Sequence, residues 1–70
     1  MSLLRVAVAG ASGRMGRLVI DQVIDAADVR LVGALEHHGS PEVGSDAGGL
    51  VGRPIGVRIV GDPALALADA

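Results

Sequence analysis

Three glycines at intervals of three residues, Gly10, Gly13 and Gly16, lie in the segment GASGRMG, between an apolar run and a helical pattern. A strand that enters a helix through a tight turn must reverse direction without side-chain clashes, and glycine permits this. We expect Gly10 to form the turn, Gly13 to let a ligand approach the backbone, and Gly16 to let the helix lie against the strand. The free N–H groups at the start of such a helix suit a pyrophosphate.

An acidic residue, Glu36, follows Gly16 by twenty residues, at the end of the next predicted strand. In dinucleotide-binding folds a carboxylate at this place accepts hydrogen bonds from the adenosine ribose. The spacing G-x-x-G-x-x-G differs from the commoner G-x-G-x-x-G, and a glycine triplet alone is a weak signal. The strand, the helix and the acid together favour dinucleotide binding over a glycine turn that binds nothing.

Hydrophobic periodicity predicts the elements that position these residues. Residues 4–9 (LRVAVA) and 29–35 (VRLVGAL) are short apolar runs typical of buried parallel strands. Between them, residues 14 to about 27 have a helical period, and Ser12 is predicted to cap this helix. Its predicted apolar face consists of Met15, Leu18, Val19, Val23 and Ala26.

The pattern becomes irregular after the second strand. Residues 37–56 hold six glycines and two prolines without a clear period, and so long a structureless segment is usually functional or mobile. Leu50 and Val51 are the residues expected to tether it to the core. Residues 57–60 predict a third strand, and Asp62 with Pro63 predicts the start of a helix over 63–70. The order of elements indicates an α/β chain with a partial Rossmann-type fold, part of a doubly wound parallel sheet in the intact protein.

Composition limits the possible partners. The 70 residues contain no cysteine, so they form neither a disulfide framework nor a thiolate metal site. A net charge of −2 with interspersed signs disfavours nucleic acid and anionic membranes as partners. No apolar run approaches the ~20 residues of a membrane span, and no signal peptide is visible. We therefore expect a cytoplasmic protein.

Several polar residues outside the glycine segment have competing interpretations. Metal binding by His37 and His38 would need a third ligand, and neighbours on an extended chain point in opposite directions, so we expect solvated histidines and no metal site. Asp46, in GSDAG, is either a turn former or a functional loop residue, and no catalytic role is assigned to it.

Three positions in the predicted helix are also ambiguous. Met15 is expected to pack in the core through its side chain, while its backbone N–H lies in the first helical turn. Arg14 either contacts a phosphate or is a solvated helix charge. Arg17 and Asp21 are spaced as a surface ion pair.

Three segments in order, GASGRMG, ALE at the end of the second strand and GSDAG in the loop, resemble the N-terminus of dihydrodipicolinate reductase (4-hydroxy-tetrahydrodipicolinate reductase). The resemblance covers essentially the whole chain. It implies an NADH- or NADPH-dependent oxidoreductase of diaminopimelate and lysine biosynthesis, which reduces the cyclic product of dihydrodipicolinate synthase. It also implies a homo-oligomer, usually a tetramer formed through the C-terminal domain.

The resemblance further implies which residues hold the cofactor. Glu36 would bind the ribose, and the following position, which often holds an arginine for the 2′-phosphate of NADPH, is His37 here. A neutral imidazole is a poorer phosphate partner than a guanidinium, so the choice between NADH and NADPH stays open. The pyrophosphate site would comprise Gly10, Ala11, Ser12, Gly13, Arg14, Met15 and Gly16.

Catalytic residues are expected outside this sequence. The family's catalytic stretch has paired histidines followed by a lysine and D-A-P-S-G-T, whereas His37-His38 is followed by Gly39, and the chain has no lysine. We therefore expect residues 1–70 to be the N-terminal part of an NAD(P)-binding domain, inactive without a substrate domain. Two alternatives remain: a non-catalytic, regulatory or redox-sensing nucleotide-binding module, and the N-terminus of another NAD(P)-dependent reductase.

Overall fold

Three parallel strands form the sheet in the computed structural model, which describes residues 3–70. They are β1 (Leu4–Ala9), β2 (Val29–Leu35) and β3 (Ile59–Val60), in the order β1-β2-β3. β1 pairs with β2 along its whole length, whereas β3 pairs only with Ala34 and Leu35. The bounds of β1 and β2 agree with the prediction, because both are apolar runs that end at a change in composition.

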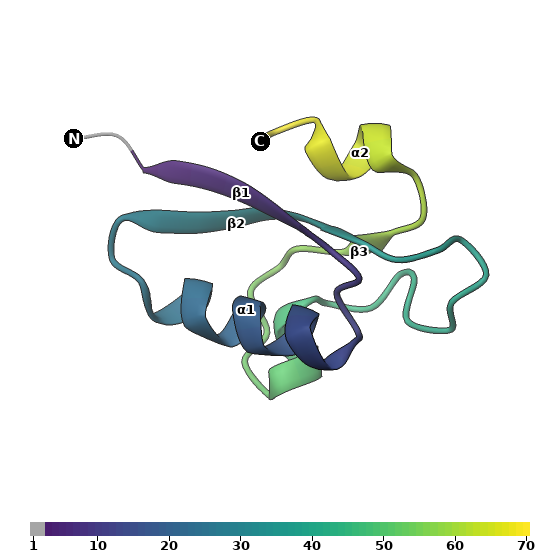
Figure 1. The fold of residues 1–70 in the computed structure, drawn as a ribbon, viewed down its shortest axis with the longest axis horizontal. Coiled ribbons are helices and arrows are strands. Elements are labelled where there is room, and N and C mark those ends of the chain that lie inside the picture. Colours follow the sequence, from purple (N-terminus) through teal and green to yellow (C-terminus); the bar gives the residue numbers. More distant parts are fainter. Residues whose placement is uncertain (1–2) are drawn as a thin grey trace.

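Helices cover both faces of this sheet (Figure 1). Helix α1 (Arg14–Asp25) and the 3₁₀ helix η1 (Gly48–Val51) pack on one face and on each other. Helix α2 (Pro63–Leu67) lies on the other face, against β2. The partial Rossmann-type α/β fold predicted from the sequence is therefore confirmed.

Two predicted elements are shorter than expected. The third strand loses Val57 and Arg58, because Arg58 forms an isolated antiparallel bridge with Asp46 of the preceding loop. Helix α2 begins at Pro63 as predicted, with the Asp62 carboxylate accepting from the Ala64 N–H at 2.9 Å, but it ends at Leu67.

Helix α1 is rotated relative to the predicted apolar face. Gly16 and Ile20 are its buried residues, whereas Met15 is 71% exposed and Leu18 is 55% exposed. The prediction that Met15 packs in the core is therefore wrong. The helix also ends at Asp25 rather than near Ala27, because the backbone becomes extended at Ala26. The rotation follows from Gly16, whose missing side chain allows close approach to the backbone of Gly10 and Ala11, directly after β1.

The core is built from small and branched aliphatic side chains. It contains Ile20 of α1 and Ile59 of β3, both fully buried, and the loop contributes Leu50 and Val51 at its edge. The segment over residues 37–56 contains the short helix η1, and Leu50 and Val51 of η1 tether it to the core as expected. The remaining buried members of this cluster are Val8, Ala11, Leu31, Ala34 and Ala47.

Arg53 ties this loop to α1 through two exposed carboxylates. Its guanidinium lies 3.2 Å from Asp21 and 2.6 Å from Asp25. The predicted pair between Arg17 and Asp21 is wrong, because the Arg17 Nε instead donates to the Ser12 carbonyl at 2.8 Å.

Replacing Arg53 with methionine is expected to lower the urea midpoint of unfolding only slightly, because exposed ion pairs are screened by water and salt. Urea unfolding at low and high ionic strength measures this change, and the difference from the unmodified protein should shrink as salt is added. A large fall in the urea midpoint that salt leaves unchanged would contradict this expectation.

Candidate functional site

The glycine segment forms the turn between β1 and α1. Gly10 has a φ of +64°, in the left-handed region that favours glycine, as predicted for the turn. The Gly13 N–H donates to the Gly10 carbonyl at 3.0 Å and closes the turn. The Ala11 N–H donates to the Leu35 carbonyl at 3.1 Å, which holds the turn beside the end of β2.

Gly16 brings α1 against this turn. A Cβ at Gly16 would lie 2.8 Å from the Cα of Ala11 and closer still to the Gly10 carbonyl oxygen, so no side chain fits there. At Gly13 the nearest such atom would be 3.4 Å away, an ordinary contact. The predicted packing role of Gly16 is confirmed. Packing within the chain does not require a glycine at position 13. The predicted role of Gly13, which is to let a ligand approach the backbone, remains a prediction.

Ser12 contacts Glu36 rather than capping the helix. The Ser12 backbone N–H and its hydroxyl both donate to Oε2 of Glu36, each at 2.7 Å. Gly13 is the N-cap residue of α1 and makes no side-chain capping bond, so the predicted Ser12 cap is wrong. The Ser12 hydroxyl can donate one hydrogen bond, and it donates that bond to Glu36.

These bonds keep Glu36 ionised. The Ser12 hydroxyl, and after it the Ser12 N–H, lower the pKa of the Glu36 carboxyl below its usual value of 4.5. The neighbouring His37 adds a smaller effect in the same direction, while partial desolvation opposes it. At neutral pH Glu36 is therefore an anion that only accepts hydrogen bonds.

A cleft of about 410 Å³ lies at the carboxyl ends of the strands, next to this carboxylate. In open α/β sheets this is the edge at which ligands bind. Gly61, which follows β3, packs directly against the backbone of His38, since a Cβ there would lie 2.6 Å from the Cα of His38. The lining comprises Gly10, Leu35, Glu36, His37, His38, Gly61 and Pro63.

Sequence reasoning missed His38, Gly61 and Pro63 as cleft residues. Gly61 carried a usable signal, because a glycine directly after a parallel strand lies at the edge where ligands bind. His38 and Pro63 carried none, since their neighbourhood depends on how β3 is placed beside β2.

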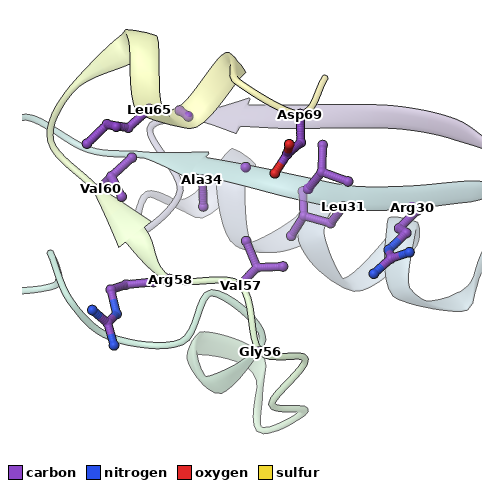
Figure 2. A pocket seen from close by; sticks show the side chains of 12 residues that line it. Arg30, Leu31, Ala34, Gly56, Val57, Arg58, Val60, Leu65 and Asp69 are labelled. Atoms are coloured by element: carbon purple, nitrogen blue, oxygen red, sulfur yellow. The ribbon is translucent and has the colours of Figure 1, made fainter.

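A second cleft, of about 280 Å³, lies between β2, residues 56–58 and α2. Figure 2 shows Arg30 and Arg58 near its opposite ends and Leu65 and Asp69 on the α2 side. No residue of GASGRMG, nor Glu36 or His37, lines it. The cleft at the strand ends is therefore the candidate site.

The other singled-out residues are placed as follows. Arg14 and His37 are exposed at the site. Asp46 lies in the loop, where its carboxylate accepts four backbone N–H groups, which favours the turn interpretation. Within residues 3–70 no group of three His, Cys, Asp or Glu residues could hold a metal ion, and no helix is long and apolar enough to cross a membrane.

Comparison with known proteins gives one consistent result. Residues 4–70 match the family described as "Dihydrodipicolinate reductase, N-terminus". The chain is 54% identical over 70 residues to a 4-hydroxy-tetrahydrodipicolinate reductase of Nitrosomonas eutropha, 50% to one of Janthinobacterium sp. (strain Marseille) and 49% to one of Burkholderia thailandensis. Each alignment covers 100% of this chain and 26% of the relative, so the chain spans about a quarter of the length of these curated relatives.

The family match agrees with the parallel sheet, the glycine turn and the acid at the end of β2. It also excludes one of the hypotheses left open above, that the chain is the N-terminus of a different NAD(P)-dependent reductase. From the extent of the match and the identities, the chain belongs to the dihydrodipicolinate reductase family, in its N-terminal part.

Proposed function

We propose that this chain is the cofactor-binding N-terminal part of a 4-hydroxy-tetrahydrodipicolinate reductase, and that it holds the adenosine half of NADH or NADPH. One observation carries the proposal: the ionised carboxylate of Glu36 is fastened to the glycine loop beside a cleft at the carboxyl ends of the strands. The family match and the names of the relatives support it.

The start of α1 would receive the pyrophosphate. The first helical bond runs from the Arg17 N–H to the Gly13 carbonyl at 3.0 Å, so the N–H groups of Arg14, Met15 and Gly16 lack an intrahelical acceptor. Such groups, with the positive end of the helix dipole, favour an anion. Gly10, Ala11 and Gly13 would form the wall that the phosphates approach.

The cleft would receive the adenosine. Its volume of about 410 Å³ lies within the range of small-molecule sites, roughly 300–1,000 Å³. Glu36 would accept hydrogen bonds from the ribose hydroxyls, and His37 would lie where a 2′-phosphate of NADPH would extend. Ser12 would act from the glycine loop, through its bonds to Glu36.

When bound, NADH or NADPH would supply the hydride for the reduction. The residues of this chain would bind the adenosine end of the cofactor, and so would position the cofactor for the reaction. Residues 1–70 would be part of the NAD(P)-binding domain, and the groups that contact the substrate would come from elsewhere in the enzyme. This chain alone would therefore be inactive. The homotetramer, the cytoplasmic location and the absence of nucleic-acid and membrane partners remain predictions.

Titration of NADH into the protein and into Glu36→Ala tests the proposal. Loss of a charge-assisted hydrogen bond to the ribose should weaken NADH binding about tenfold or more. Circular dichroism first establishes that each variant is folded. Asp28→Ala, which removes an exposed carboxylate in the turn before β2, is the matched control and should bind like the unmodified protein. Equal NADH affinity in Glu36→Ala would overturn the proposed site.

A further inference from the structure

Two hydrogen bonds from one residue converge on a single oxygen of Glu36. Ser12 directs both its N–H and its hydroxyl to Oε2, at 2.7 Å each, across 24 positions of sequence. An ionised carboxylate has two lone-pair sites on each oxygen, so Ser12 fills those of Oε2. Neither bond uses Oε1, which keeps two acceptor sites for other donors.

Those two sites match the ribose of NADH. The 2′- and 3′-hydroxyls of its adenosine are two donors on neighbouring carbons, and Oε1 offers two acceptor sites beside the cleft. In NADPH the 2′ position is instead a phosphate, which is anionic at neutral pH and presents acceptor oxygens. A fixed carboxylate and this phosphate repel each other, and no hydrogen bond forms between them.

Rotation of Glu36 away from the phosphate would relieve this repulsion. Ser12 opposes the rotation, because turning the carboxylate breaks two short charge-assisted bonds and leaves the partly buried Ser12 donors without an acceptor. Among residues 3–70 the salt bridges are those of Arg53 with Asp21 and Asp25, so no cationic side chain is paired with Glu36.

We propose that Ser12 is a positioning residue that holds Glu36 against the 2′ position and so makes the site prefer NADH over NADPH. The inference rests on the proposed function, because it assumes that the ribose lies at Glu36. It adds a residue that sets cofactor choice without needing to touch the cofactor.

The test compares NADH and NADPH dissociation constants, by isothermal titration, in the protein expressed from its own gene. The ratio of the NADPH constant to the NADH constant should exceed one. Ser12→Ala removes the hydroxyl and keeps the N–H, so the ratio should fall about three- to tenfold, the value of one hydrogen bond. Ser12→Thr retains a hydroxyl and should restore the ratio.

A double variant separates positioning from direct contact. In a Glu36→Ala background, Ser12→Ala should leave the ratio unchanged, because there is no carboxylate left to hold. Ser12→Gly, which adds no atom to the turn, repeats the comparison if Ser12→Ala has a lowered melting temperature.

Three results would overturn the inference. In the first, the ratio of dissociation constants in Ser12→Ala and Ser12→Gly stays within twofold of the ratio in the unmodified protein, while Glu36→Ala changes it. This result would leave the proposed function intact. Another is an effect of Ser12→Ala that persists without Glu36, which would mean direct contact with the cofactor. The third is unchanged NADH binding in Glu36→Ala, which overturns the proposed function as well.

Discussion

Gly16→Ala is expected to lower the free energy of unfolding by about 2 kcal/mol or more. Alanine is favoured over glycine within a helix by about 1 kcal/mol, but overpacking costs about 3 kcal/mol here. The cost is at the upper end because the new Cβ would meet backbone atoms of Gly10 and Ala11, which cannot move aside as a flexible side chain can. Native domains are stable by only 0.05–0.15 kcal/mol per residue, roughly, so this is a large fraction of the total.

Urea unfolding followed by circular dichroism measures this loss. Gly49→Ala is the matched control, since the added Cβ would lie 3.7 Å from the Cβ of Asp46, an ordinary contact. That control should stay within about 0.5 kcal/mol of the unmodified protein. If both variants unfold at the same urea concentration, α1 does not pack on the turn as described. We expect Gly16→Ala also to weaken NADH binding, whereas Gly49→Ala should bind NADH like the unmodified protein.

Asp46→Ala is expected to cost about 2 kcal/mol, because it removes the acceptor for several backbone N–H groups of the loop at once. Oδ1 of Asp46 accepts from Gly48 at 2.8 Å, Ile55 at 3.0 Å and Gly49 at 3.3 Å, and Oδ2 accepts from Gly56 at 2.6 Å. These bonds fold residues 46–56 into one unit and hold η1 against α1. Thermal and urea unfolding at pH 7 measure the cost.

Asp46→Asn provides a graded comparison. Its amide oxygen can replace Oδ1, but its NH₂ group would face the Gly56 N–H, so two donors would meet. We expect a loss of stability smaller than that of Asp46→Ala and larger than zero. A loop that is unaffected by either change at pH 7 would contradict the role assigned to this carboxylate.

The pH dependence of the Asp46 contribution has a definite sign. The N–H groups of Ile55, Gly56, Gly48 and Gly49 lower the pKa of the Asp46 carboxyl below its usual value of 3.8, against partial desolvation. A depressed pKa stabilises the fold above the unfolded-state pKa, and this stability is lost as pH falls through the folded-state pKa. The stability difference between the unmodified protein and Asp46→Ala should therefore be full at pH 7 and shrink below about pH 4.

The sequence by itself determined the features that depend on a few neighbouring residues. The runs LRVAVA and VRLVGAL have the bounds of β1 and β2, and α1 begins at Arg14 as predicted. The left-handed Gly10 and the capping Asp62 are also local, since backbone sterics and a side chain two residues from its partner settle them. The family follows from the same short segments.

Tertiary structure alone decided which side chains meet across the chain. Ser12 bonds to Glu36 over 24 positions and Arg53 reaches Asp21 over 32, so neither pairing has a period or a motif that reveals it. The rotation of α1 likewise depends on contact between Gly16 and the turn, and this contact exposes Met15 despite its apolar side chain. Periodicity reports which residues share a face, but packing against the sheet selects the face that is buried, because close approach of two backbones requires the smallest residue at the point of contact.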